Sequence, residues 1–264
     1  MNPWQGKWAL ITGASAGIGT AIARELAAGG TNLILTARRR DRLAGLATEL
    51  TDKHKIRTLV CVADLSQPQG PQQIFSFTEE KNISVDLLVN NAGFGAYGEF
   101  HKAAVERLVE MTQVNVSAVV HLTRLFLPGM IERRNGDILI LASTAAFQAV
   151  PYISTYAATK AFDLYFAEGL AEEVRPYGVR VCALCPGSTE TEFFKVAGQR
   201  NHTRRSPETP EKVARVGLRA LAAGKSFVVS GFANKLASET VRLVPRRTVA
   251  RVAAGIFRPK GTKV

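Results

Sequence analysis

Short apolar runs recur along this chain, and most are followed by a longer stretch of helical periodicity. The apolar runs cover residues 7–11, 32–37, 58–63, 85–89, 137–141 and 179–184. Runs of this length, bounded by turn-forming residues, are typical of strands that are buried on both faces of a sheet. The stretches between them repeat apolar residues at every third or fourth position, as amphipathic helices do. Strands and helices that alternate in this way predict an α/β fold with a Rossmann-type doubly wound parallel sheet.

The chain is long enough for one large domain. Its 264 residues are 46% hydrophobic, which supports a sizeable core without a second domain. We expect the sheet and its helices to occupy residues 1–230. Residues 231–264 hold eight lysines and arginines against one acid, more than half of the net charge of +12. Apolar residues recur among these charges, with Pro245 between two segments, so a basic amphipathic helical C-terminal extension is predicted.

The basic extension admits three interpretations. Its helices can pack on their own domain with their charges in water, which we favour. They can instead lie on an anionic membrane surface, as basic amphipathic helices do, or contact a partner subunit. Nucleic-acid binding is not predicted, because the charges are not interleaved with aromatic residues and no binding motif is present.

Signals for targeting and for metal binding are scarce. The first apolar segment, Trp8 to Ile11, is too short for a signal peptide or a membrane span and runs directly into a glycine-rich loop. The sequence therefore favours a cytoplasmic protein, with peripheral membrane contact left open. Cys61, Cys182 and Cys185 show no metal-ligand pattern. We interpret them as small buried apolar residues and predict no metal site.

The first predicted strand ends in a glycine-rich loop, residues 12–19, that opens a helix. Glycines let the backbone turn tightly and approach a pyrophosphate, while the N-terminus of the helix favours its negative charge. We therefore expect a dinucleotide to contact this loop at Gly13, Ser15, Gly17, Ile18 and Gly19.

Three arginines follow the second predicted strand, where a dinucleotide fold meets the adenosine ribose. An acid there would bind the ribose 2′-hydroxyl, but residues 38–40 are all arginine and Asp41 comes only after them. Arg38, with Arg39 beside it, can pair with a 2′-phosphate, so NADP(H) is favoured over NAD(H). The alternative is that these arginines are solvated and cap a turn.

Tyr156 and Lys160 stand four residues apart on a predicted helix, so both side chains lie on one face. A tyrosine hydroxyl has a pKa of about 10, and a positive charge within roughly 4–6 Å lowers it. Such a pair can give a proton to a carbonyl oxygen, or take one from an alcohol, near neutral pH. Alone, the spacing is weak evidence, and a solvated tyrosine and lysine would be the default interpretation.

Taken together, these motifs resemble the classical short-chain dehydrogenase/reductase family over about residues 7–230. Besides the glycine loop and the Tyr156–Lys160 pair, the resemblance rests on Asp64, Asn115, Ser143 and two short runs, 90–93 and 186–191. All of them occur in the family's order and spacing.

The resemblance implies a catalytic set of Asn115, Ser143, Tyr156 and Lys160. Tyr156 would be the general acid in reduction and the base in oxidation, and Ser143 would hold the substrate oxygen. Lys160 would bind the nicotinamide ribose and lower the pKa of Tyr156, and Asn115 would support a water that links Lys160 to solvent. Moving that pKa from about 10 to near 7 requires roughly 4 kcal/mol, which we expect from the ammonium and an oxidised nicotinamide.

Further cofactor contacts are expected at the ends of later strands: Asp64, Leu65, Asn91, Ala92, Gly93, Pro186, Gly187, Thr189 and Thr191. Many NADP-using family members also carry a basic residue inside the glycine loop, where this chain has Ala14, Ser15 and Ala16. Only one of two phosphate anchors is therefore present. Helices equivalent to those of Asn115 and Tyr156 often pair between subunits in the family, which implies a homodimer or homotetramer.

Substrate choice is expected to come from the loop after Pro186. Phe193, Phe194 and Val196 in this loop could cover a lipophilic carbonyl compound, with Phe94, Phe147 and Val150 opposite, although all six could equally be packing residues. Further along the loop, Arg200, Arg204 and Arg205 could attract an anionic carrier, but a solvated charge run is favoured.

The sequence therefore predicts an oxidoreductase that transfers a hydride between NADP(H) and a small-molecule carbonyl compound or secondary alcohol, with a tyrosine as general acid and base. One alternative is narrower: a 3-oxoacyl thioester reductase of lipid synthesis. Another is a sensor or scaffold that binds NADP(H) without turnover. The intact Ser143, Tyr156 and Lys160 argue against the sensor, because a protein that only binds has no need of a proton donor.

Overall fold

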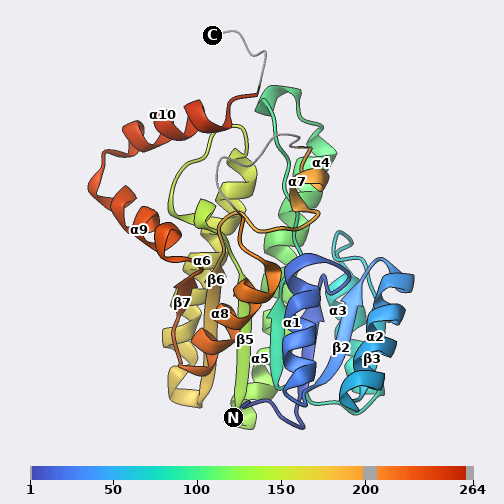
Figure 1. Ribbon diagram of the computed structural model, residues 1–264. Coiled ribbons are helices and arrows are strands. Elements are labelled where there is room, and N and C mark those ends of the chain that lie inside the picture. The colour runs from blue at the N-terminus through green and yellow to red at the C-terminus, as the bar shows by residue number, and fades with distance from the viewer. Residues whose placement is uncertain (1, 199–206, 260–264) are drawn as a thin grey trace.

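Seven parallel strands form a single sheet in the computed structural model, which describes residues 2–198 and 207–259 (Figure 1). The order across the sheet is β3-β2-β1-β4-β5-β6-β7. The strands are β1 (Trp8–Thr12), β2 (Asn32–Ala37), β3 (Thr58–Val62), β4 (Leu87–Asn90), β5 (Gly136–Leu141), β6 (Val179–Cys185) and β7 (Phe227–Val229). The predicted doubly wound parallel sheet is confirmed. Strand β7 was not predicted, because its three residues are too few to show a pattern.

Helices cover both faces of the sheet. One face carries α1 (Gly17–Ala28), α2 (Arg40–His54) and α8 (Pro210–Ala222). The other carries α3 (Gly70–Glu80), α4 (Val105–Thr112), α5 (Ala118–Glu132) and α6 (Ser154–Val174). Short helical turns join them: η1 (Phe100–Lys102), η3 (Thr144–Phe147) and η4 (Arg175–Tyr177).

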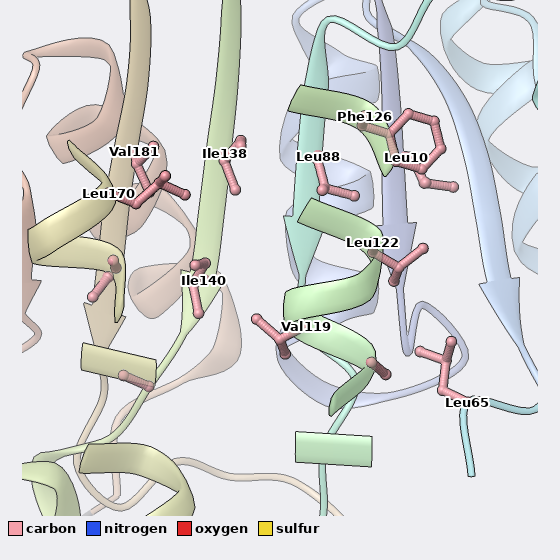
Figure 2. Packing of buried hydrophobic residues seen from close by; sticks show 14 of the residues in the cluster. Leu10, Leu65, Leu88, Val119, Leu122, Phe126, Ile138, Ile140, Leu170 and Val181 are labelled. Atoms are coloured by element: carbon pink, nitrogen blue, oxygen red, sulfur yellow. The ribbon is translucent and has the colours of Figure 1, made fainter. Parts of the chain in front are cut away.

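Two apolar layers result, because neighbouring residues of a parallel strand enter opposite faces. In β1, for example, Leu10 belongs to the layer under α3–α6 and Ile11 to the layer under α1, α2 and α8. Figure 2 shows the first layer, where Leu122 and Phe126 of α5 lie against Leu10 and Leu88 of the sheet. The apolar runs of the sequence are therefore strands, which are buried on both faces in the centre of the sheet and only partly buried in the edge strand β3.

The helical region between β4 and β5 is interrupted in its middle. Between α4 and α5 lies the π-helical turn η2 (Gln113–Ser117), which contains Asn115. Such wide turns occur frequently at functional sites. The stretch Val105–Glu132 is long and apolar enough to cross a membrane by length and composition. In this fold it packs on the sheet as a core helix.

The chain after β7 forms two helices and a turn: α9 (Phe232–Thr240), η5 (Val241–Leu243) and α10 (Arg246–Phe257). Pro245 lies directly before α10, which agrees with the break predicted there. Ala253 of α10 packs with Val150 and with Ala157 of α6. Figure 1 shows α10 and the short α7 (Phe193–Val196) at the end of the molecule opposite the N-terminus.

The other end of the sheet is closed by a polar network. Trp4 Nε1 donates a hydrogen bond of 2.7 Å to Asp137 Oδ2, and Arg180 donates to both carboxylate oxygens at 2.6 and 2.8 Å. Both Trp4 and Asp137 are buried. The network fixes the N-terminal segment to β5 and β6, far from the carboxyl ends of the strands.

The three cysteines are free and buried, as the sequence indicated. Burial raises the pKa of the Cys61 thiol to about 11 and that of Cys182 to about 12. These thiols are therefore protonated and unreactive at neutral pH.

Candidate active site

The carboxyl ends of the central strands open into one cavity of about 540 Å³. The glycine loop, the start of α6, the loop after β6, α7 and Phe257 of α10 contribute to its walls. The predicted cofactor-binding residues that line it are Gly13, Ser15, Gly17, Ile18, Arg38, Arg39, Asp64, Leu65, Asn91, Ala92, Gly93, Tyr156, Lys160, Pro186, Gly187, Thr189 and Thr191. Residues from the two ends of the predicted site thus face one continuous space.

Gly19 is the one predicted cofactor residue that does not line the cavity, because it packs beneath the glycine loop. A Cβ atom there would lie 2.6 Å from the carbonyl oxygen of Gly13. Gly13 and Gly17 have positive φ angles of 66° and 58°, a conformation that favours glycine. The loop therefore needs glycine at each of the three positions, for two different reasons.

Thr12 and Asn91 hold the glycine loop against the end of β4. Thr12 Oγ1 accepts hydrogen bonds of 2.9 Å from the backbone amides of Asn91 and Ala92. Asn91 Nδ2 donates to the carbonyl of Thr12 at 2.7 Å and to that of Gly13 at 3.3 Å. Asn90, by contrast, points into the core, where Nδ2 donates to Thr123.

Ser143, Tyr156 and Lys160 come together in the middle of the cavity. Ser143 follows β5, and the other two lie on the first turns of α6. The hydroxyl of Ser143 is hydrogen-bonded to the phenol of Tyr156, and the Lys160 ammonium lies 6.0 Å from the centre of the phenol ring. Ser143 Oγ also accepts a 3.1 Å hydrogen bond from the amide of Ala145, which orients it. Two hydroxyls and an ammonium thus line one wall.

The pKa of Tyr156 differs from the sequence expectation. Burial raises it above the ordinary value, and this effect outweighs the lowering by Lys160 and by the hydrogen bond from Ser143. The ring of Phe193 lies 5.0 Å from the ring of Tyr156 and covers it. Lys160 alone therefore does not bring the phenol toward neutral pH, and a further positive charge would be required.

Asp163 is a buried partner of Lys160 that the sequence interpretation missed. Lys160 Nζ donates to Asp163 Oδ2 at 2.9 Å and to the carbonyl of Leu141 at 2.6 Å. Burial would lower the pKa of Lys160, but the Asp163 carboxylate together with Tyr156 and Cys185 more than offsets it, so this pKa is raised. Burial raises the pKa of Asp163 as well. The available signal was an acid three residues after Lys160, on the same side of a largely apolar helix.

Asn115 does not line the cavity but lies directly behind it. Its Oδ1 accepts from the amide of Phe94 at 3.1 Å, and its Nδ2 donates to the carbonyl of Phe94 at 3.0 Å and to Thr159 Oγ1 at 3.1 Å. A Cβ atom on Gly93 would lie 3.1 Å from Asn115 Oδ1 and 3.5 Å from Lys160 Nζ. Asn115 thus ties the loop after β4 to α6, and glycine at 93 permits the close approach.

The adenosine end of the cavity contains Arg38, Arg39 and Asp64. Arg39 donates to Ser15 Oγ from Nε at 3.1 Å and from Nη2 at 3.0 Å. Arg38 instead forms an ion pair of 3.3 Å with Glu110. Asp64 Oδ1 accepts from the amide and the hydroxyl of Ser66. Arg39, more than Arg38, is therefore the arginine joined to the glycine loop.

Of the six apolar residues predicted around the substrate, the structure brings four to the cavity. Phe94, Phe193, Phe194 and Val196 line it, whereas Phe147 and Val150 do not. The ring of Phe147 packs on that of Phe227, with centres 6.3 Å apart, and Val150 packs under α10. Arg200, Arg204 and Arg205 lie outside the described residues.

Several cavity residues were not predicted as substrate contacts: Arg107, Ala197 and Phe257. The guanidinium carbon of Arg107 lies 3.8 Å from the centre of the Phe94 ring. The substrate side is therefore mainly apolar, with one arginine over the face of the Phe94 ring.

Comparison with known proteins places this arrangement in a family. Residues 7–202 match the family model described as short chain dehydrogenase. The chain is a classical short-chain dehydrogenase/reductase. It is accordingly an oxidoreductase, and the resemblance noted in the sequence is confirmed.

Three relatives illustrate the range of similar dehydrogenases. The very-long-chain 3-oxoacyl-CoA reductase of Bos taurus is 34% identical over 218 residues, which cover 81% of this chain and 69% of the reductase. A short-chain dehydrogenase from Sphingobium yanoikuyae in complex with NADPH is 27% identical, with a TM-score of 0.83 and 98% of each chain covered. The L-sorbose reductase from Gluconobacter frateurii, complexed with NADPH and L-sorbose, is 31% identical, with a TM-score of 0.77 and coverage of 88% of this chain and 98% of the reductase.

Proposed function

We propose that this dehydrogenase reduces lipophilic carbonyl compounds with NADPH, or oxidises the corresponding secondary alcohols with NADP⁺. The observation that carries the proposal is the meeting of Ser143, Tyr156 and Lys160 between a glycine loop and an apolar wall within one cavity. A phenol, a hydroxyl and an ammonium at that place provide a proton donor and its supports. The wall beyond them provides room for an apolar substrate.

The roles of the side chains follow from their positions. NADPH, when bound, supplies the hydride for the carbonyl carbon. Tyr156 gives its proton to the carbonyl oxygen, which completes the alcohol, and Ser143 donates a hydrogen bond to the same oxygen. The Lys160 ammonium stabilises the phenolate that remains and is itself held by Asp163. In oxidation, the phenolate takes the proton of the alcohol.

NADP(H) fits the adenosine end of the cavity. Gly13 and Gly17 supply a glycine backbone where a pyrophosphate would lie, and the Arg39 guanidinium and Ser15 hydroxyl stand beside each other at the end of β2. No acid directly follows β2, since residues 38–40 are arginines. Two similar dehydrogenases were solved with NADPH, which supports the same cofactor here. We infer a preference over NAD(H) from the arginines.

A 3-oxoacyl thioester reductase is the narrower candidate. The similarity to the very-long-chain 3-oxoacyl-CoA reductase favours it. The apolar lining around Phe94, Val196 and Phe257 suits an acyl chain, and Arg107 beside Phe94 suits an anionic carrier group. A sensor without turnover has less support, because it would not need the buried Lys160–Asp163 pair behind the phenol.

The direct test is oxidation of NADPH, followed by its absorbance, with ketones, aldehydes and acyl thioesters as substrates. We expect turnover of at least one lipophilic carbonyl compound and much less with NADH. Activity confined to carrier-bound thioesters would select the narrower candidate. Tight NADPH binding without turnover of any carbonyl compound in a broad panel would contradict the proposal and favour the sensor.

We propose a homo-oligomer assembled through α4, α5 and α6. Large apolar side chains of these helices are exposed, among them Val105 and Val109 of α4 and Phe162 and Tyr165 of α6. A second copy of the same face would cover them and would leave the cavity free. Light scattering after size exclusion should give at least a dimer, and Tyr165→Lys should shift it to the monomer. A wild-type monomer at micromolar concentration would contradict this arrangement.

We further propose that the protein is cytoplasmic and binds peripherally to anionic membranes. The contact would be made by its C-terminal extension, residues 231–264. Leu243 is 84% exposed, and Val252 and Ile256 of α10 are about 60% exposed beside Arg247 and Arg251. Exposed apolar residues among arginines suit the surface of an anionic bilayer. Flotation with phosphatidylserine vesicles should recover the protein, and phosphatidylcholine vesicles should recover much less. Equal recovery with both lipids, or none with either, would contradict this contact.

A further inference from the structure

Glu192 lies between two arginines at the adenosine end of the cavity. Its Oε2 accepts a hydrogen bond of 2.9 Å from Arg39 Nη1, and its Oε1 accepts one of 2.9 Å from Arg42 Nη1. The same Arg39 donates to the Ser15 hydroxyl. Two guanidinium groups thus hold a single carboxylate, and one of them also contacts the Ser15 hydroxyl. These hydrogen bonds lower the pKa of Glu192 to about 2, so it is an anion at every physiological pH.

The groups around this carboxylate are those that bind a phosphate monoester. Guanidinium pairs and a hydroxyl are typical ligands of phosphate oxygens. Arg39 directly follows β2, and in doubly wound folds the ribose 2′-substituent of a dinucleotide lies at this strand end. Arg42 stands on the first turn of α2, three residues further along. The carboxylate of Glu192 therefore occupies a place suited to a 2′-phosphate.

Glu192 also belongs to the segment that covers the reaction centre. Immediately before it, Thr191 packs on the glycine loop, since a Cβ atom on Gly17 would lie 2.9 Å from Thr191 Cγ2. Immediately after it, Phe193 begins α7 and its ring covers Tyr156. Residues 191–193 consequently contact the glycine loop, the two arginines and the proton donor at the same time. A change at Glu192 is passed by the backbone to Phe193.

We infer that the Glu192 carboxylate occupies the 2′-phosphate site of the cofactor when that site is empty. The 2′-phosphate of NADP(H) then displaces the carboxylate, which releases residues 191–193 from their position over Tyr156. This inference rests on the proposed NADP(H)-dependent function. NAD(H) carries a neutral hydroxyl at that position and does not compete with a carboxylate for two guanidinium groups. Glu192 then acts as a specificity determinant, and it couples occupation of the cofactor site to access for the substrate.

The strength of the ion pairs of Glu192 with Arg39 and Arg42 follows from their exposure to solvent. The side chains of Arg39, Arg42 and Glu192 are each nearly half exposed to solvent. Exposed ion pairs contribute little individually. We therefore expect that removing the carboxylate tightens binding of a 2′-phosphate ligand about fivefold, which corresponds to roughly 1 kcal/mol. Ion pairs of this strength are readily displaced when the cofactor binds.

Calorimetry measures the affinity of the proposed 2′-phosphate site for adenosine 2′,5′-bisphosphate without turnover. The control ligand is 5′-AMP, which lacks the 2′-phosphate. Glu192→Gln should tighten the bisphosphate about fivefold and leave 5′-AMP unchanged. Arg42→Gln should weaken the bisphosphate alone. Glu190→Gln is the matched control, because it removes an exposed charge of the same sign two residues away. It should change neither ligand's affinity more than about twofold.

Hydrogen exchange of the α7 backbone tests the release. In the wild type, the amides of Val196 and Ala197 donate to the carbonyls of Glu192 and Phe193. Adenosine 2′,5′-bisphosphate should speed exchange at these amides, and 5′-AMP should not. In the Glu192→Gln variant, exchange should be fast without ligand.

The outcomes separate the inference from the function on which it rests. If the bisphosphate binds the wild type and the Glu192→Gln and Glu190→Gln variants equally well, Glu192 does not compete with the 2′-phosphate, and the NADP(H) proposal stands. If exchange in α7 does not respond to the bisphosphate, the coupling is wrong. If the bisphosphate binds no better than 5′-AMP to any of these proteins, the 2′-phosphate site at Arg39 and Arg42 and the NADP(H) preference are both overturned.

Discussion

Replacing Asp163 by asparagine should destabilise the protein strongly, because it leaves the buried Lys160 ammonium without its counter-charge. Two unit charges 2.9 Å apart attract by about 6 kcal/mol at an effective dielectric constant near 20. Removing one partner of a buried pair costs about 3–5 kcal/mol in free energy of unfolding. The carbonyl of Leu141 still accepts a hydrogen bond from Lys160, so we expect the lower end, about 3 kcal/mol at pH 7.

The loss should depend on pH, with a sign that follows from Lys160. In the wild type its pKa is raised, so its stabilising contribution is present below the unfolded pKa and is lost as pH rises through the folded one. In the variant the effect of Asp163 is lost and burial, the largest influence, lowers the folded pKa below the unfolded value of about 10.4. The penalty is then full at neutral pH and shrinks as pH rises toward about 10. The gap between the two proteins should therefore narrow with pH.

Urea unfolding of both proteins at pH 7 and at about pH 9.5 measures this gap. Glu172→Gln is the control on the same helix, because it breaks an exposed pair with Arg175 and should cost less than about 0.5 kcal/mol. Lys160→Met combined with Asp163→Leu should recover most of the stability, since no charge is left buried. A loss below about 1 kcal/mol for Asp163→Asn, or a loss independent of pH, would refute this account of the pair.

Three other predictions concern the cavity and the far end of the sheet. Gly19→Ala should weaken NADPH binding at least tenfold, about 1.4 kcal/mol, because its methyl group would press against the Gly13 carbonyl. A fluorescence titration measures the NADPH affinity. The control Gly45→Ala, whose methyl group meets open space, should leave that affinity unchanged. Trp4→Phe should lower the free energy of unfolding by about 1–3 kcal/mol, because Asp137 loses a buried donor, and kcat should stay unchanged. Because burial raises the pKa of Tyr156, kcat/KM for reduction should stay level from about pH 6 to pH 9 and fall only above, as the phenol loses its proton; a fall centred near pH 7 would contradict this.

The parts of the fold that local sequence determines were predictable. Apolar runs identify six of the strands because apolar residues fill most of their positions on both faces of the sheet. Glycine spacing identifies the loop at residues 12–19 because the backbone geometry at positions 13, 17 and 19 requires glycine. The three residues of β7 and the wide turn around Asn115 depend on packing partners far along the chain, so no local pattern reveals them.

Side-chain partners were predicted less well than positions. Phe147 and Val150 were placed near the substrate, but β7 and α10 cover them, and neither packing could be read from a short segment. Arg39 and not Arg38 joins the glycine loop, because the direction of each side chain is set by the turn into α2. The partnership of Asp163 with Lys160 requires knowing which face of α6 is buried.

Tyr156→Phe tests the central claim most directly, namely that Tyr156 donates the proton in carbonyl reduction by NADPH. The variant keeps the ring that packs against Phe193 and removes only the hydroxyl. NADPH oxidation with the best carbonyl substrate should fall by a factor on the order of 10² or more, while NADPH binding, measured by fluorescence, stays as in the wild type. Full turnover by the variant would show that another group supplies the proton and would contradict the assignment.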